Sequence, residues 1–301
     1  MTKTTPSALS RLPEGWRVLR TWGPASFVTH ALLERPDGTQ VEWNSRRHRK
    51  ALGLRGSEAR RQRRQERWGG RPSAMSWWMG ALFGLGAICF AVGSVPIYFD
   101  NIDPGFLAGT FFVGSILFTS AGYLQFHETV HAPDSVLPGS PAQHGLRALI
   151  GWRPRRIDWW AALIQLVGTV MFNVSTFAAT RSDLSLDQSR HLIWAPDIGG
   201  SICFLVASWL AYAEVNRGIL PRSDRSTGWR IAVLNLGGSV AFGAAAIGAR
   251  YVGSAGDPAN VSLVNLGTFV GAVGFLVGAA LLPVESAKDA SPSGGRVASP
   301  G

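Results

Sequence analysis

Long blocks of apolar residues alternate with polar blocks along this chain. Residues 77–99 and 106–126 are two such blocks, each uncharged and more than 20 residues long, and only the sequence DNIDPG separates them. At 1.5 Å per residue, a helix of this length crosses the roughly 30 Å hydrocarbon core of a bilayer. We therefore predict a transmembrane helical hairpin.

The hairpin pattern occurs three times. Further apolar blocks pair at 159–179 with 194–213 and at 229–252 with 262–284, and the charged residues crowd between the blocks. This distribution is typical of a multi-pass membrane protein. The predicted fold is an all-α integral membrane protein with six transmembrane helices. We predict the hairpins at 77–128, 159–214 and 229–285, cytoplasmic linkers at 129–158 and 215–228, and a disordered cytoplasmic tail at 286–301.

The three hairpins share residues at fixed spacings, which indicates an internal repeat. In each first helix, a glycine and a phenylalanine follow the opening tryptophan by nine and 13 residues. In each second helix, a phenylalanine and a glutamate follow a glycine by four and 14 residues. The predicted repeat interface residues are Trp77, Gly86, Phe90, Gly114, Phe118 and Glu128, then Trp159, Gly168, Phe172, Gly200, Phe204 and Glu214, then Trp229, Gly238, Phe242, Gly271, Phe275 and Glu285.

Glycine on a helix face lets two backbones approach, which is how helices associate in lipid. Gln165 and Asn235 lie three residues before their repeated glycines, and Asn173 lies deeper in its helix. We predict that these amides hydrogen-bond neighbouring helices. A site for a transported ligand is the alternative interpretation.

The distribution of Lys and Arg predicts the orientation. Segments on the N-terminal side of the membrane hold 26 of the 29 basic residues, and the opposite loops hold only Arg181, Arg190 and Arg250. Because positive residues stay on the cytoplasmic side, we predict both termini in the cytoplasm and the protein in a bacterial plasma membrane. The repeated glutamates then either form a ring at a cytoplasmic mouth or point outward to Arg217 and Arg230.

Two residues near the predicted outer ends have simple interpretations. Pro96 is expected to kink the last turn of the first helix. Asp197 is expected to be a solvated carboxylate near a helix N-terminus, where the helix dipole favours negative charge.

Residues 1–76 form a basic cytoplasmic segment. The runs FVTHALLE and TQVEW flank the turn sequence Pro36-Asp37-Gly38 and predict a β-hairpin between Phe27 and Trp43. An isolated hairpin is only marginally stable in water, so it would need Trp16, Trp22 or another surface to pack against.

Basic residues follow this hairpin at 45–50 (SRRHRK) and at 57–68, where a short helix with Ser57 as N-cap is expected. Arg60, Arg61, Arg63, Arg64 and Arg67 leave that helix almost no apolar face. We interpret the cluster as a topogenic signal that contacts anionic lipid head groups. Nucleic acid is the less favoured partner, although the formal net charge of the chain is +10.

The only two cysteines, Cys89 and Cys203, lie inside apolar blocks, so the sequence predicts neither a disulfide framework nor a cysteine-rich metal site. Residues 1–24 contain no apolar core of the kind that a cleavable signal peptide has. The first membrane helix is therefore expected to act as the insertion signal.

The sequences GAICFAVGS at 86–94 and FFVGSILF at 111–118 resemble the YrhK-like two-helix domain, an uncharacterised bacterial membrane family. The whole chain is similar to actinobacterial multi-pass proteins with an Arg-rich N-terminal segment. The resemblance covers roughly residues 77–285 and implies paired membrane helices but no catalytic residue. The second hairpin departs from it, with Ser175-Thr176 where the first has Gly93-Ser94.

One motif points to different chemistry. His127-Glu128-Thr129-Val130-His131 matches the His-Glu-x-x-His pattern, in which two histidines on one helix face bind zinc and the glutamate acts as general base. We favour another role, because Glu128 is already the repeated terminal glutamate and Pro133 ends the helix early. A third ligand would have to come from elsewhere, with Asp134, His144, Asp158, Glu214 and Glu285 as candidates.

The sequence predicts no catalytic residue and no cofactor. The preferred interpretation is a non-enzymatic membrane component, either a helper subunit or a structural protein, because the helices carry almost no ionisable residue away from their ends. A transporter or channel for a small solute or ion is the alternative, favoured by the internal repeat. The expected partners are the lipid bilayer, other membrane proteins and a second copy of the chain.

Overall fold

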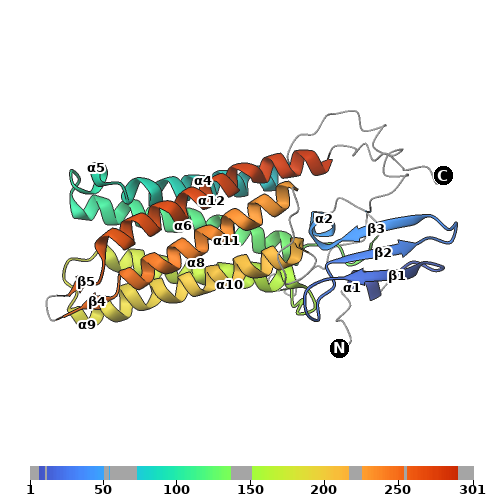
Figure 1. Ribbon diagram of the computed structural model, residues 1–301, viewed down its shortest axis with the longest axis horizontal. Coiled ribbons are helices and arrows are strands. Elements are labelled where there is room, and N and C mark those ends of the chain that lie inside the picture. Colours follow the sequence, from blue (N-terminus) through green and yellow to red (C-terminus); the bar gives the residue numbers. More distant parts are fainter. Residues whose placement is uncertain are drawn as a thin grey trace.

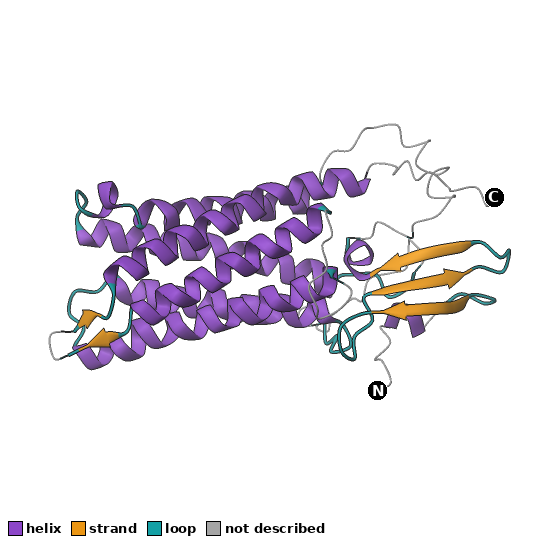
Figure 2. Ribbon diagram, in the orientation of Figure 1, coloured by secondary structure: helices purple, strands orange, loops and turns teal. Residues whose placement is uncertain are grey.

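A bundle of long helices carries a small β-sheet at one end (Figures 1 and 2). This computed structural model describes residues 7–10, 12–50, 54, 73–136, 151–216, 226–253 and 256–290. We call the end of the bundle that faces the sheet the sheet end, and the opposite end the distal end.

Within the described ranges, six helices are long and apolar enough to cross a membrane. This confirms the prediction of a mostly helical, multi-pass architecture. The helices are α4 (Ala74–Gly93), α6 (Pro104–Val130), α8 (Ile157–Ala179), α10 (Ala195–Val215), α11 (Thr227–Gly248) and α12 (Val261–Ala290).

Two predictions about the distal end are wrong. Pro96 does not kink the first helix, because α4 has already ended at Gly93 and Pro96 instead begins the short helix α5 (Pro96–Phe99). The sequence RSDLSLDQSRH at 181–191, expected as the loop of the second hairpin, is partly helical: α9 (Leu186–Ser189) and η1 (Arg190–Trp194) lead directly into α10. A capping box between Ser185 and Gln188 starts this helical stretch by satisfying two backbone N–H groups.

The long helices form a ring. Each packs against its neighbours in sequence, and α12 also packs against α4, which closes the circle. On the distal side, the strands β4 (Tyr251–Val252) and β5 (Asp257–Pro258) pair between α11 and α12. Helices far apart in sequence therefore surround one common axis.

Within each hairpin, the two helices meet at the repeated glycines. A Cβ atom added to Gly86 would lie 2.9 Å from the backbone oxygen of Gly114, and one added to Gly238 would lie 2.9 Å from that of Gly271. In the second hairpin a Cβ atom at Gly168 would lie 3.1 Å from the oxygen of Gly200. These distances leave no room for a side chain, so the backbones touch at the positions that the sequence alignment equates.

The repeated phenylalanines fill the axis of the ring. Phe118, Phe204 and Phe275 form a triangle with ring centroids 5.6, 5.8 and 6.2 Å apart. Each of them also packs, at 5.2 to 5.8 Å, on the other repeated phenylalanine of its own hairpin, giving the pairs Phe90 with Phe118, Phe172 with Phe204 and Phe242 with Phe275. We call these residues the Phe cluster. It is the core of the bundle.

The N-terminal sheet has three antiparallel strands within the described residues, in the order β1 (Arg17–Trp22), β2 (His30–Glu34) and β3 (Gln40–Asn44). The predicted hairpin is confirmed as β2 and β3, and the turn between them contains Gly38 at a φ of +79°. Strand β1, which ends at Trp22, was not predicted. Apolar residues from the sheet, from α1 (Ser7–Ser10) and from the segment after α6 form its core, among them Leu9, Leu33, Val41, Trp43 and Val136.

The adjacent glycines Gly237 and Gly238 give a matched test of the hairpin contact. An alanine at Gly238 would push against the backbone of Gly271 and the ring of Phe275, at 2.9 and 3.0 Å, whereas a Cβ atom at Gly237 meets nothing within 4 Å. We expect Gly238→Ala to destabilise the protein by about 1 to 3 kcal/mol. Gly237→Ala should be neutral or stabilising by up to about 1 kcal/mol, because alanine favours the helix. Thermal melting of both variants in detergent measures the difference, and equal melting temperatures would contradict the contact.

Candidate functional site

A short basic helix, α2 (Ser45–Arg49), lies between the sheet and the helix ring (Figure 1). It begins directly after β3, and the side chain of Asn44 caps it by accepting a hydrogen bond from the backbone N–H of Arg47 at 3.2 Å. Because no linker separates strand from helix, the sheet holds α2 in a fixed orientation against the ends of the long helices.

Arg49 of α2 contacts acidic side chains from three long helices. Its Nε lies 3.2 Å from Glu128, its Nη1 lies 3.0 Å from Asp158, and the same Nη1 lies 3.7 Å from Glu214. The Arg49 side chain is 10% exposed and that of Glu214 is 3% exposed. Asp158 is also held by Arg156, at 2.6 Å. One guanidinium group therefore joins α6, α8 and α10.

Glu285 of α12 receives the other two inward-facing cations of the α2 segment. Arg46 donates two hydrogen bonds to its carboxylate, at 2.7 and 2.9 Å, and the Nζ of Lys50 donates a third at 2.7 Å. The hydroxyl of Ser45 donates to Glu214 at 2.5 Å. The carboxylate of Glu285 also lies against Gly228 at the beginning of α11, where a Cβ atom would meet it.

The repeated glutamates thus gather around α2. The sequence left open whether they form a ring or point outward to Arg217 and Arg230. In the structure their cations come from residues 46–50 instead, while Arg230 is exposed and Arg217 lies outside the described residues. The roles of Arg46, Arg49 and Lys50 were missed because the carboxylates that they contact lie at least 79 residues away in sequence. For Asp158 the sequence did not indicate the ion pair with its near neighbour Arg156 either. The only sequence signal for these ion pairs was that acidic residues stand at the ends of apolar blocks, next to basic segments.

These charges balance. Around α2 the described residues place five cations against five carboxylates, which sums to zero. We call this set the charge cluster: Arg46, Arg47, Arg49, Lys50 and Arg156 with Glu128, Asp158, Glu214, Glu285 and Asp289.

The electrostatics of α2 follow from this pairing. Burial alone would lower the pKa of Arg49, but the charges of Glu214, Asp158 and Glu128 outweigh burial and raise it. The pKa of Arg46 is raised in the same way, because the charge of Glu285 outweighs the effect of burial. Both side chains therefore stay charged at every physiological pH, and the cluster cannot be neutralised by loss of their protons.

His48, on the same short helix, has the opposite behaviour. Burial, together with the positive charge of Arg156, lowers its pKa to about 4. Its Nε2 lies 2.8 Å from the backbone oxygen of Pro133. A neutral imidazole with the proton on Nε2 donates this hydrogen bond, so α2 is held to the segment after α6 by an uncharged histidine.

A small cavity lies between the charge cluster and the Phe cluster. Its volume is about 70 Å³, and we call it the inner cavity. Arg46, Arg49, Lys50 and Glu128 border it on the sheet side, and Phe83 and Phe275 border it toward the middle of the bundle. The rest of the lining is mixed. The polar side chains are Ser76, Gln125, Gln165, Ser208 and Asn235, and apolar ones such as Met79, Ile231 and Leu282 lie between them.

The predicted interhelical hydrogen bonds of Gln165, Asn235 and Asn173 are not present among the described residues. Gln165 and Asn235 line the inner cavity. Among the described residues, the buried side-chain oxygens of Asn235 and Asn173 have no hydrogen-bond partner. Hydroxyl groups join the hairpins instead, through the pairs Ser115 with Thr176 and Ser208 with Ser239, each at 2.8 Å. These shorter side chains fit where the helix backbones are close.

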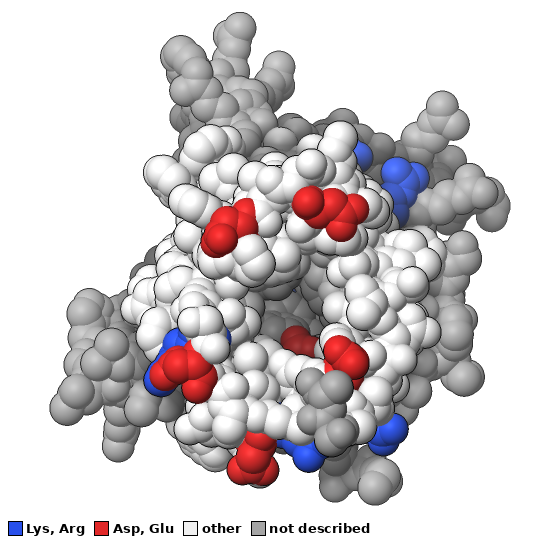
Figure 3. Space-filling view, turned by 90° about the vertical axis from the view of Figure 1, so that its left-hand side faces the viewer, with Lys and Arg blue, Asp and Glu red and all other residues white. Residues whose placement is uncertain are grey.

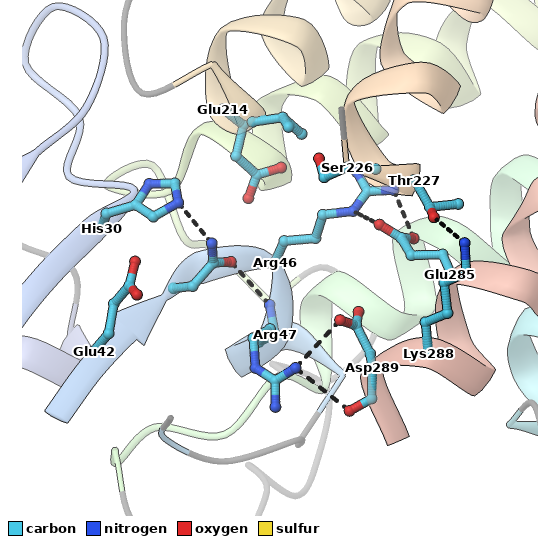
Figure 4. A pocket seen from close by; sticks show the side chains of 13 residues that line it. His30, Glu42, Arg46, Arg47, Glu214, Ser226, Thr227, Glu285, Lys288 and Asp289 are labelled. Carbon is cyan, nitrogen blue, oxygen red and sulfur yellow. Dashed lines mark hydrogen bonds and ion pairs between the residues drawn. The ribbon is translucent and has the colours of Figure 1, made fainter. Parts of the chain in front are cut away.

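A second, more open cleft lies beside the charge cluster (Figure 4). Its volume is about 400 Å³, and it is lined from the sheet by His30 and Glu42, and from the helices by Ser226, Thr227 and Lys288 among others. Figure 4 shows Arg46 reaching across this region to Glu285, while Arg47 pairs with Asp289 at its edge. The cleft therefore lies along the junction that α2 closes.

The distal end of the bundle is hollowed at its centre, with acidic side chains inside and around the hollow (Figure 3). Asp197 lies near this end, close enough to the β4 residue Tyr251 that its charge adds to the effect of burial in raising the pKa of Tyr251. In sequence, the distal segments contain six aspartates, Asp100, Asp103, Asp183, Asp187, Asp197 and Asp257, against three arginines, Arg181, Arg190 and Arg250.

The His-Glu-x-x-His motif ends α6. The rings of His127 and His131 stack with centroids 3.9 Å apart, while Glu128 points to Arg49. No group of three possible metal ligands occurs within the described residues. The proposed third ligands there are paired with cations: Asp134 with Arg153, and Asp158, Glu214 and Glu285 within the charge cluster. His144 lies outside the described residues.

The repeated tryptophans share a level on the bundle but not an environment. Trp77 is 50% exposed, Trp159 is 1% exposed, and Trp229 is half-buried. In the basic segment predicted to contact lipid, every residue of 45–50 except His48 contacts a protein carboxylate, and His48 contacts a backbone oxygen. The helix expected at 57–68 lies outside the described residues.

Comparison of the chain with protein-family models, with curated protein sequences and with solved structures finds no match. The resemblance to the YrhK-like domain therefore stays a prediction.

Removing Arg49 tests the charge cluster. Arg49→Ala leaves Glu128 and Glu214 buried without their cation, and we expect it to destabilise the protein by about 3 to 5 kcal/mol. The exposed pair of Arg181 and Asp183, 52% and 68% exposed, is the control. Arg181→Ala should cost about 1 kcal/mol or less. Thermal melting in detergent measures both, and equal losses would contradict the assigned role of Arg49.

His48 predicts a pH dependence. Its pKa is about 4 when α2 is docked and 6.5 when it is free, so the undocked form binds more protons between these values. The stability that docking of neutral His48 contributes is fully present above pH 6.5. It is lost as the pH falls, by about 2 kcal/mol at pH 5. His48→Gln keeps an N–H donor for Pro133 but does not titrate. Melting curves from pH 7.5 to 5 should fall more steeply for the wild type than for this variant, and parallel curves would refute the assignment.

Proposed function

We propose that this protein is a non-enzymatic membrane protein that lets a small cation pass along the axis of its helix ring. One observation carries the proposal: a closed ring of membrane-length helices surrounds, in series, a distal hollow, the Phe cluster, the inner cavity and the charge cluster. The sequence favoured a helper subunit or structural protein. A ring with polar space at both ends of its axis favours the alternative that the sequence offered.

The path is closed at two levels in the described residues. The Phe cluster fills the middle of the axis, and desolvation makes an apolar constriction a barrier to ions. The charge cluster covers the inner cavity on the sheet side through Arg46, Arg49 and Lys50. Both closures would have to open for passage, and α2 is the part that comes from outside the ring.

The charge along the axis favours cations. Acidic side chains surround the distal hollow (Figure 3), and the sheet end of the ring contributes the carboxylates of Glu128, Glu214 and Glu285. Rings of carboxylates are the usual means of selecting cations in channels. Among the described residues, the cations that pair with these three glutamates all belong to the α2 segment.

We also propose the orientation with cytoplasmic termini and the threefold repeat of the hairpin. With both termini in the cytoplasm, as the Lys and Arg count predicts, the sheet and α2 lie at the cytoplasmic mouth and the distal hollow opens outward, in a bacterial plasma membrane. The identical glycine contacts of the three hairpins support the view that they are copies of one unit.

Opening both closures together tests the path. We expect the double variant Arg49→Ala/Lys50→Ala, and the variant Phe204→Asn, each to change cation flux little, because the other closure remains. The triple variant should raise flux into liposomes at least about tenfold, equal to a barrier lowered by about 1.4 kcal/mol.

Phe106, which is 75% exposed at the distal end, provides the control. Arg49→Ala/Lys50→Ala combined with Phe106→Asn leaves the Phe cluster intact and should conduct no more than the double variant. Phe90→Ser replaces Phe204→Asn if the latter does not elute as a folded protein. Folded triple variants that conduct no better than this control would exclude the axial path.

A further inference from the structure

The cation that occupies the mouth of the inner cavity comes from a part of the chain that is not part of the ring. Arg49 lines the cavity and is held by Glu128, Asp158 and Glu214, which stand on three different long helices. Each of these carboxylates is carried by a helix of the ring and not by α2. The carboxylates therefore form a receptor, and the guanidinium group of Arg49 is its occupant.

Removal of α2 would leave this receptor charged. Asp158 keeps its ion pair with Arg156, but Glu128, Glu214 and Glu285 lose the cations that face them. Their side chains are 12%, 3% and 7% exposed. These exposed fractions hold with α2 docked. With α2 away, three carboxylates at one end of the ring would lack a counter-charge, and their mutual repulsion would favour binding of a cation from solution.

The geometry indicates which cation. The carboxylates of Glu128, Asp158 and Glu214 surround one guanidinium group, and the Nε and Nη1 atoms of Arg49 lie 3.0 to 3.7 Å from them. A planar guanidinium group presents several N–H donors to separate carboxylates, as Arg49 does here. A primary ammonium group offers three donors to one site, as Lys50 does at Glu285.

We propose that the mouth of the inner cavity binds small organic cations of the guanidinium or primary ammonium class, and that Arg49 and Lys50 are tethered occupants that compete with them. This inference deepens the proposed function and rests on it for the identity of the transported cation. The volume beyond the mouth is about 70 Å³, which is too small for a peptide. Its lining combines amide and hydroxyl groups with apolar side chains, which suits a compact organic cation.

Binding is measured on the purified full-length protein in detergent, without any flux assay. The probe is guanidinium chloride at low millimolar concentration, with sodium chloride at the same ionic strength as reference. We expect guanidinium to raise the melting temperature of Arg49→Ala saturably. The wild type should bind at least about tenfold more weakly, because a tethered side chain competes at an effective concentration in the millimolar range.

Two further variants define the site. Arg49→Ala/Glu128→Gln/Glu214→Gln should lose the guanidinium effect. Arg181→Ala should behave as the wild type, because Arg181 pairs with the exposed Asp183 at the distal end and does not line the inner cavity. If Arg49→Ala does not fold, Lys50→Ala with methylammonium chloride makes the same test, since Arg46 still holds Glu285 in that variant.

Equal stabilisation by sodium and guanidinium, or equal binding to the variant without the two carboxylates, would overturn the inference. The outcomes separate it from the proposed function. Selective binding without flux in the opened triple variant would defeat the axial path, while flux without selective binding would defeat only the assignment of the cation.

Discussion

The contact of two glycine backbones in each hairpin is the constraint on which the arrangement depends. In lipid, helices gain little from burying apolar surface, so close van der Waals packing has to hold them together. Where Gly168 meets Gly200, no side chain intervenes. The contact also fixes the register of the two helices. Phenylalanines four residues beyond each glycine then pack on each other at the axis, and the second helix of each hairpin ends in a glutamate at the same level.

The bundle delivers carboxylates to one end, and the N-terminal sheet delivers the cations. Buried ion pairs are poor sources of net stability, because desolvation offsets most of the attraction. Their effect here is specific: Arg46 can satisfy Glu285 only when Arg49 reaches Glu128 and Asp158, since a single short helix carries both arginines. The charge cluster therefore defines one docked position of the sheet, and any displacement leaves several charges unpaired at once.

The sequence predicted what depends on local pattern. Membrane helices need about 20 apolar residues, and each block showed this directly; the β2–β3 hairpin followed from Pro36-Asp37-Gly38. The closure of the ring by α12 against α4, and the meeting of α2 with the glutamates, depend on contacts between distant segments that no local pattern contains. The prediction of interhelical hydrogen bonds from Gln165 and Asn235 was wrong, because local sequence could not show that these positions face a cavity.

The depth of the two closures follows from helix geometry. Ten residues separate Phe118 from Glu128, which is about 15 Å along a helix, half the thickness of the hydrocarbon core. If the Phe cluster lies near the middle of the bilayer, the charge cluster lies at its surface. Apolar rings then occupy the level where a charge is least tolerated, and the carboxylates lie where water and the basic helix can reach them. Exposed tryptophans such as Trp77, at 50%, agree with an interface at that level. A cation entering from the sheet side would therefore meet its binding groups before its main barrier, which is the order in which a selective path must be built.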